Sequence, residues 1–139
     1  MYLEPVTIVE LREFEREFNI KFPETYSAFL LNGNVAQDWM SYTYRYKDQE
    51  DRAIISGFLS LRRIERSLKL LQNRIPDKYI PIGSTPGGDL IIICLESENY
   101  GNIFHWNHEE EDENNLMFNI YFISEKFADF INALEKVQF

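Results

Sequence analysis

Two histidines stand three residues apart, His105 and His108, and a run of carboxylates follows them at once. The pattern His-x-x-His beside acids is one that metal sites use. In an extended strand the first and fourth residues point to opposite faces, so both rings could reach one ion only if the chain bends after Trp106. A metal also needs a third, firmly held ligand, which acids in a loop supply poorly. We therefore expect no bound metal and no cofactor.

The remaining reactive side chains are few. Cys94, the single cysteine, lies in the apolar run 90–95 and is predicted to be a small buried hydrophobe. Asp89 ends the glycine-rich stretch 84–89, which lacks the lysine and the following helix of a phosphate loop. An aspartate beside a turn more often bonds nearby backbone amides than acts as a general base. The chain is thus not expected to be an enzyme, with a small metal-dependent hydrolase using His105, His108 and a neighbouring acid as an alternative.

Charge is distributed unevenly along the sequence. The formal net charge is −9, and the span from residue 79 to residue 125 contains nine acids but no lysine or arginine, while the rest of the chain balances 14 acids against 14 bases. Such a balance opposes binding to nucleic acid, because phosphate would be repelled. It fits a basic protein as the partner, since acids attract and steer such a partner.

Aromatic residues near the acids provide the second half of a protein-binding surface. Charge runs are usually solvated loops, but aromatic side chains beside them can supply affinity. The predicted anchors are Trp39, Tyr100 and Trp106. The predicted steering acids are Glu96, Glu98, Glu109, Glu110, Glu111, Asp112 and Glu113.

Length and composition favour one domain spanning residues 1–139. A chain of this size can bury a substantial core without a metal or disulfide, and 45% hydrophobic residues argue against disorder. The N-terminus lacks the basic region of a secretory signal, and the apolar runs are too short to cross a bilayer. We expect a cytoplasmic protein that does not bind membranes.

Helices are predicted at both ends of the chain. Pro5 fits the first position of one helix, a second begins at residues 22–24 and stops at 32–34, and Ser60 can cap a third. The basic residues of the third helix are interpreted as a solvated face. Ser124 is expected to cap a closing helix whose apolar face runs from Phe127 to Val137.

Strands are predicted between these helices, over residues 39–46, 53–59, 79–84, 90–95 and 103–107, and residues 117–123 are a last apolar strand or an approach segment. The run 90–95 is apolar on both faces, so it should lie centrally. Pro86 and Gly87-Gly88 have the chemistry of a type II turn joining two of these strands. The result is an α+β fold, a single antiparallel sheet packed with N-terminal and C-terminal helices, whose sheet edges leave a homodimer possible.

These motifs in this order resemble the SUKH superfamily, which contains the Smi/Knr cell-wall-regulator-like proteins. The resemblance rests on Phe-Pro-Glu-Thr-Tyr-Ser-Ala-Phe-Leu-Leu-Asn-Gly at 22–33, Ile-Pro-Ile-Gly at 80–83, Gly-Asp at 88–89, Tyr-Gly-Asn-Ile at 100–103, Trp106 and the aromatic segment 127–131. It implies an α+β fold. It also implies that Gly83, Gly88, Asp89 and Trp106 define the fold, with Gly88 and Asp89 shaping the turn, rather than performing catalysis.

The resemblance implies a function in protein binding. Many bacterial members are thought to be immunity proteins that neutralise polymorphic toxins, whereas fungal members are linked to cell-wall synthesis and signalling. The short chain lacks the long additional regions of the fungal proteins, which favours the immunity role. The expected partner is a basic toxin of the nuclease type, and a regulatory scaffold is the alternative.

Overall fold

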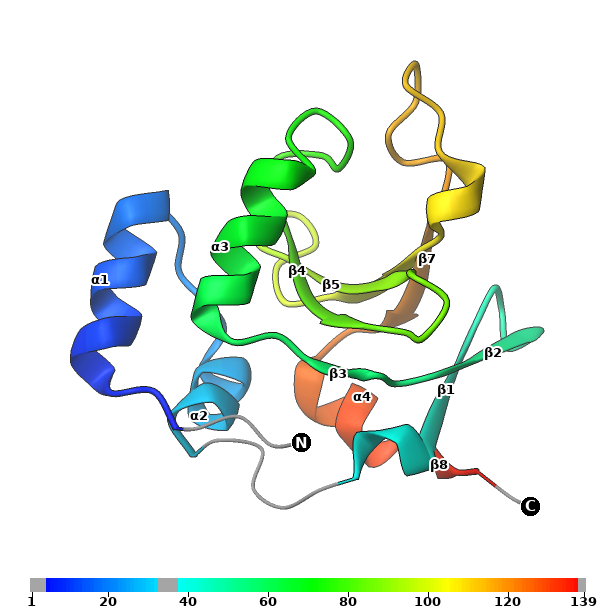
Figure 1. The fold of residues 1–139 in the computed structure, drawn as a ribbon, viewed down its shortest axis with the longest axis horizontal. Coiled ribbons are helices and arrows are strands. Elements are labelled where there is room, and N and C mark those ends of the chain that lie inside the picture. Colours follow the sequence, from blue (N-terminus) through cyan, green and yellow to red (C-terminus); the bar gives the residue numbers. More distant parts are fainter. Residues whose placement is uncertain (1–4, 33–37, 138–139) are drawn as a thin grey trace.

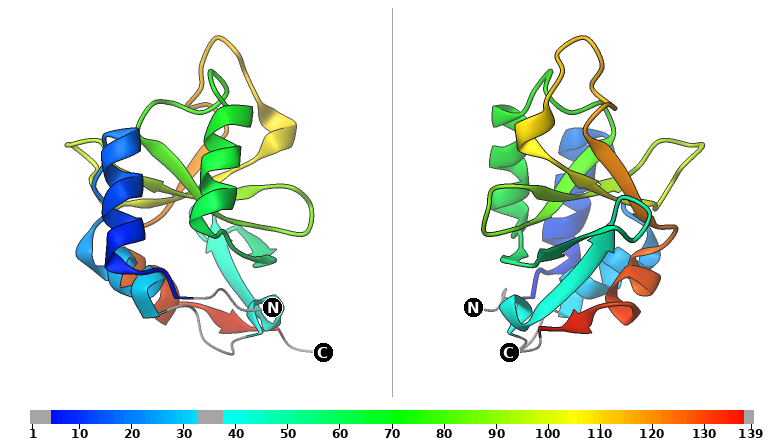
Figure 2. Two further views of the ribbon diagram at one scale, coloured as in Figure 1. Left: turned by 60° about the vertical axis from the view of Figure 1, so that its left-hand side comes forward. Right: turned by 90° about the vertical axis from the view of Figure 1, so that its right-hand side faces the viewer.

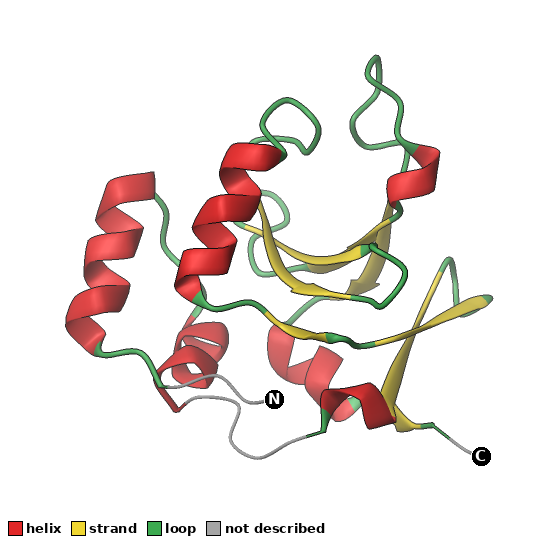
Figure 3. Cartoon of the chain, viewed as in Figure 1, coloured by secondary structure: helices red, strands yellow, loops and turns green. Residues whose placement is uncertain are grey.

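The computed structural model describes residues 5–32 and 38–137 and has the predicted α+β class (Figures 1 and 3). The helices are α1 (Ile8–Phe18), α2 (Glu24–Asn32), α3 (Leu61–Leu70) and α4 (Phe127–Asn132), with short 3-10 helices η1 (Trp39–Ser41) and η2 (His108–Glu110). The strands are β1 (Tyr42–Tyr46), β2 (Asp51–Ile54), β3 (Gly57–Phe58), β4 (Tyr79–Ser84), β5 (Leu90–Cys94), β6 (Ile103–Trp106), β7 (Ile120–Ser124) and β8 (Glu135–Lys136). Within the described residues, no helix is long and apolar enough to cross a membrane.

The larger sheet has the antiparallel order β3-β4-β5-β6-β7. Its middle strand β5 is buried from Ile91 to Cys94, as the two-sided apolar pattern predicted. The register between β4 and β5 shifts between Pro81 and Gly83. A Cβ atom on Gly83 would lie 3.0 Å from Ile91 Cδ1 and 3.2 Å from the Gly57 carbonyl oxygen, so the close approach of β3 favours glycine there.

A second sheet, β2-β1-β8, corrects the expectation of a single one. The predicted strand 53–59 divides between the two sheets, because β2 pairs with β1 and β3 pairs with β4. At the crossing, the Ile55 N–H donates to the Tyr42 carbonyl and the Ser56 N–H donates to the Ser84 carbonyl. Both backbone groups are therefore satisfied while the chain changes sheets, which the sequence of residues 53–59 alone did not indicate.

Two helix boundaries also differ from the prediction. Helix α1 begins at Ile8, and a capping box formed by Thr7 and Glu10 closes its N-terminus, so Pro5 lies outside the helix. The closing helix α4 ends at Asn132, and β8 then pairs with β1. The second sheet thus takes the segment that helical periodicity assigned to α4. The predicted stop of α2 lies partly outside the described residues, whereas α3 and its Ser60 cap are confirmed.

The hydrophobic core is divided by the larger sheet. The main cluster joins one face of the sheet to the helices and to β1, through residues such as Ile82, Ile91, Tyr26 and Phe130. A smaller cluster on the other face contains Ile75, Tyr79, Ile92, Cys94, Phe104 and Trp106. Cys94 is fully buried, as predicted. The segment that follows α3 covers this second face, so both sides of β5 are shielded from water.

Candidate partner-binding site

The two histidines meet at Asp89, which follows the turn between β4 and β5. Leu90 is paired with Trp106, so the start of β5 and the end of β6 lie side by side. One Asp89 carboxylate oxygen lies 2.8 Å from His105 Nε2, and the other lies 2.6 Å from His108 Nδ1. The latter oxygen also accepts the His108 backbone N–H. The chain does bend after Trp106, but both rings contact a carboxylate of the chain itself.

Turn geometry brings Asp89 to this position. Gly88 has φ +100°, whereas Gly87 is not among the glycines with positive φ, so the turn is not the predicted type II turn. The Gly88 N–H donates to the Thr85 carbonyl, and the Thr85 hydroxyl accepts the Asp89 N–H. A Cβ atom on Gly88 would lie 3.4 Å from the His108 ring. Gly88 therefore serves both the turn and the approach of His108, while Pro86 is exposed.

His105 lies fully buried between the two sheets. Its ring is stacked on Tyr46 with 3.7 Å between centroids, and the Tyr44 hydroxyl oxygen lies 2.6 Å from Nδ1. With its proton on Nε2, a neutral His105 donates to Asp89 and accepts from Tyr44, so both ring nitrogens are satisfied. Burial lowers the pKa of His105 despite the neighbouring carboxylate. Burial also raises the pKa of Tyr44 well above its ordinary value, with the Asp89 charge adding to the effect.

Asp89 is the charged member of this cluster. Burial would raise its pKa, but hydrogen bonds from His108 and His105 outweigh burial and hold the pKa below the ordinary 3.8. Among the described residues, no group of three or more histidine, cysteine, aspartate or glutamate side chains is placed to hold a metal. Both nitrogens of the His105 ring already have hydrogen-bond partners. This ring is therefore not free to bind a metal, as the hydrolase alternative would require. The acidic loop is defined as residues 108–116. Asp89 holds the start of this loop in place through His108, so its role is structural.

Two of the acids in this loop are fixed by partners elsewhere in the fold. Glu110 accepts the Tyr121 hydroxyl at 2.6 Å and lies 3.6 Å from Lys47 Nζ. Glu111 forms a two-pronged ion pair with Arg74, at 2.9 and 2.7 Å, and the Arg74 guanidinium lowers the pKa of Glu111. These bonds tie the loop to the β1–β2 turn, to β7 and to the segment after α3. The acidic loop therefore leaves the sheet in a defined direction.

Three acids of the loop remain directed to solvent or only locally bonded. The Glu109 side chain is 79% exposed, and Glu113 is exposed. Asp112 accepts the backbone N–H of Asn114. Their charges are thus available to a partner, whereas those of Glu110 and Glu111 are already compensated.

The other predicted acids lie at the opposite end of strands β5 and β6. Glu96 and Glu98 are exposed in the connection between these strands, which leaves the sheet away from the acidic loop (Figure 2). Tyr100 lies in the same connection, is 45% exposed, and donates its hydroxyl to the Lys21 carbonyl at 2.5 Å. The acidic third of the sequence therefore forms two separate surfaces and not the one that its continuity suggested.

Both tryptophans predicted as anchors are core residues. Trp39 is 6% exposed and Trp106 is 2% exposed, and Arg74 lies over the Trp106 ring at 5.6 Å. Their aromatic bulk is used to fill the two hydrophobic clusters, so neither presents a surface to a partner. Composition and neighbourhood in sequence could not distinguish an aromatic residue of the core from one at an interface.

Other apolar residues are exposed instead. Among the described residues, the large exposed ones are Ile8, Val9, Met40, Ile54, Leu70, Tyr100, Met117, Phe118 and Phe122. Three of these follow the acidic loop directly, within residues 117–122. Sequence reasoning interpreted residues 117–123 as a last apolar strand or approach segment and did not single out these side chains as exposed. Met117 and Phe118 stand immediately after the acidic loop, and this position is the signal that could have revealed their exposure.

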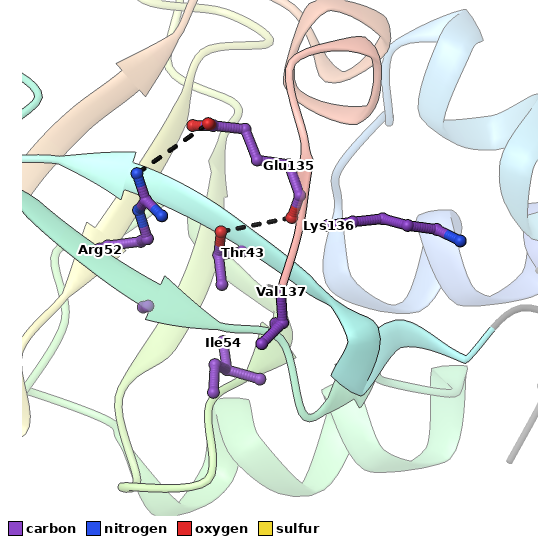
Figure 4. Close-up of a pocket in the computed structure, with 7 residues that line it drawn as sticks. Thr43, Arg52, Ile54, Glu135, Lys136 and Val137 are labelled. Atoms are coloured by element: carbon purple, nitrogen blue, oxygen red, sulfur yellow. Dashed lines mark hydrogen bonds and ion pairs between the residues drawn. The ribbon is translucent and has the colours of Figure 1, made fainter. Parts of the chain in front are cut away.

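A groove on the smaller sheet is lined by residues of β1, β2 and β8, among them Thr43 and Ile54, and by Val137 just after β8 (Figure 4). Glu135 lies 2.7 Å from Arg45 and 3.9 Å from Arg52, so one carboxylate serves both guanidiniums. Thr43 donates its hydroxyl to the Glu135 carbonyl. These polar contacts hold the short strand β8 against β1 and β2. The residues that line the groove are thus accounted for by the packing of the smaller sheet, without a ligand.

Comparison with known proteins identifies relatives of this fold. The model of the SMI1 / KNR4 family (SUKH-1) matches residues 5–133. The chain is similar to the SPbeta prophage-derived uncharacterized protein YokK of Bacillus subtilis (strain 168). The two are 26% identical over 145 aligned positions, which cover 90% of this chain and 72% of that protein.

Proposed function

The chain belongs to the SMI1 / KNR4 family (SUKH-1), and we propose that it is a cytoplasmic immunity protein that binds a cognate toxin and blocks it. The family resemblance described above motivates this role. The prophage origin of the relative in Bacillus subtilis supports a protective function over a housekeeping one. Inhibition would be stoichiometric, because a bound protein can block an active site without doing chemistry itself.

The observation that carries the proposal is the acidic loop held in place at one end of the larger sheet. A loop that is already ordered loses little conformational entropy on binding. Glu109 and Glu113 remain exposed on it, next to apolar side chains. A nuclease must attract phosphate and therefore has a basic cleft, which such a loop could enter in competition with nucleic acid.

Co-purification followed by a growth assay tests this function. The chain is isolated from its native host, and each stoichiometric partner is expressed alone and together with the chain in a second bacterium. The proposal expects one basic partner that stops growth alone and is harmless when the chain is present. A set of partners that never impairs growth would contradict it, and a signalling or envelope protein among them would favour a scaffold.

A further inference from the structure

Strand β7 lies at one end of the strand order of the larger sheet. It pairs with β6 on one side, and within residues 5–32 and 38–137 no strand pairs with its other side. The backbone groups of an edge strand can accept a further strand from another molecule. Proteins commonly protect such an edge with a lysine or proline, but β7 has the sequence Ile-Tyr-Phe-Ile-Ser. The strand itself therefore contributes no protecting lysine or proline. Lys47 of the β1–β2 turn lies over the Tyr121 ring at 4.9 Å, whereas the neighbouring Phe122 is exposed.

Exposed apolar side chains accompany this edge. Phe122, in the middle of β7, is 50% exposed, and Met117 and Phe118 just before the strand are 44% and 58% exposed. Phe122 packs edge-to-face on Phe104, with 5.9 Å between the ring centroids. One side of its ring is therefore held while the other faces solvent. Aromatic residues in this state are typical anchors of protein interfaces, because little side-chain freedom remains to be lost.

The charge around the edge selects the kind of partner. Residues 107–125 contain six acids and no lysine or arginine. Lys47 and Arg74 compensate Glu110 and Glu111, so the charge that remains is that of Glu109, Asp112, Glu113 and Glu125. A partner with lysine or arginine side chains opposite these acids would be attracted to the apolar edge.

We infer that the β7 edge surface, defined as β7 with Met117 and Phe118, binds an extended basic segment of the partner. This inference rests on the proposed function and specifies where the toxin contacts the chain. The segment would add a strand to β7, place apolar side chains against Phe118 and Phe122, and direct its bases toward the acidic loop. A second copy of the chain fits this surface less well, because a twofold interface brings equal acids together.

Site-specific photocrosslinking in living cells tests this assignment. Phe118 and Phe122 are each replaced by p-benzoylphenylalanine, and the native host is irradiated. The matched controls carry the same photoreactive residue in place of Val9 on α1 or Leu70 on α3, which are 62% and 68% exposed. We expect a single adduct with a basic protein from positions 118 and 122, and none from the controls. Adducts with the chain itself, equal adducts at all positions, or no adduct at 118 and 122 would overturn the inference.

The protein recovered from the adduct then supports a quantitative test. Purified partner is titrated against Phe122→Ser and against the control Val9→Ser, whose unfolding curves are first shown to match that of the unaltered chain. The inference expects at least about tenfold weaker binding for Phe122→Ser, as for an interface anchor, and unchanged binding for Val9→Ser. Equal affinities would overturn it.

The two proposals can fail separately. A partner that crosslinks at 118 and 122 but does not impair growth would leave the surface assigned and remove the immunity function. A toxin that crosslinks only through a photoreactive residue at position 100, in the connection between β5 and β6, would retain the function and move the site.

Discussion

The two ends of strands β5 and β6 carry similar charge but differ in how they are built. At one end, Asp89 binds two histidines, Glu110 binds Tyr121, and Glu111 binds Arg74. At the other end, no hydrogen bond or ion pair joins the Glu96 or Glu98 carboxylate to another described residue. The same residue types are thus fixed at one end and solvated at the other.

This difference shows why charge in a sequence does not by itself locate a binding site. A fixed loop can present a defined shape to a partner, whereas solvated acids at a turn contribute mainly to the long-range field. We therefore propose that the partner contacts the end with Asp89 and the acidic loop. The predictions that follow test whether the two ends differ in stability and in binding.

The largest stability effect is expected at Asp89. Asp89→Ala removes the acceptor of the buried His105 and of His108, and the loss of such a buried partner costs about 3 kcal/mol. Denaturant titration measures the free energy of unfolding. The control Glu98→Ala lies at the other end and should change it by less than about 0.5 kcal/mol. Similar losses for both variants would show that the two ends are equivalent after all.

Tyr44→Phe should have the next largest effect. The substitution leaves His105 Nδ1 buried without its donor, at an expected cost of about 1–2 kcal/mol. Tyr42→Phe is the matched control, because Tyr42 is on the same strand and its hydroxyl has no hydrogen-bond partner among the described residues. A neutral Tyr44→Phe in the same denaturant assay would mean that this hydrogen bond adds no stability.

Acidification should weaken the fold before the ion pairs titrate. Burial lowers the pKa of His105 below 6.5, so the unfolded chain binds a proton more readily and the free energy of unfolding falls as the pH drops below about 6.5. For one proton the slope is at most about 1.4 kcal/mol per pH unit. The lowered pKa of Glu111 and that of Asp89 add losses only below 4.5 and 3.8. Unfolding is therefore measured from neutral pH to about 5, above the range of these two carboxylates, and constant stability there would contradict a buried neutral His105.

The smallest effect is expected for the ion pair between Arg74 and Glu111, which lies beside Trp106 of the smaller hydrophobic cluster. Arg74 and Glu111 are partly exposed, so solvent screens the pair and its coupling energy should be about 0.5–1 kcal/mol. A double-mutant cycle with Arg74→Gln and Glu111→Gln measures this coupling. A coupling near zero would mean that the acidic loop is held by Asp89 and Glu110 alone.

Much of the fold was predictable because its strongest signals are local. The apolar run 90–95 specified the central strand, and Ser60 with its following stripe specified α3. The second sheet was not predictable, because Ile55 and Ser56 look like the interior of one strand and only pairing with Tyr42 and Ser84 shows the crossing. The predicted end of α4 was wrong for the same reason, because residues 135–136 pair with β1, which is distant in sequence.

The candidate site was predicted in its charge but not in its geometry. The acidic loop and the need for a bend after Trp106 came from the sequence. The contact of Asp89 with His105 and His108 joins residues 16 and 19 positions apart, and no local pattern indicates it. Trp106 and Phe122 lie on the same face of the larger sheet, yet one is buried and the other is half exposed. Their difference depends on how much of that face the rest of the chain covers, which a pattern of large apolar residues does not indicate.

Association kinetics with the proposed toxin would decide whether the exposed acids of the acidic loop steer binding. The double variant Glu109→Gln/Glu113→Gln is compared with Glu96→Gln/Glu98→Gln by stopped-flow mixing at low and high salt, so each removes two exposed charges. We predict that the first variant associates about tenfold more slowly at low salt and loses salt dependence, while the second stays close to the unaltered chain. Equal rates for the two variants, or a larger effect of the second, would contradict it.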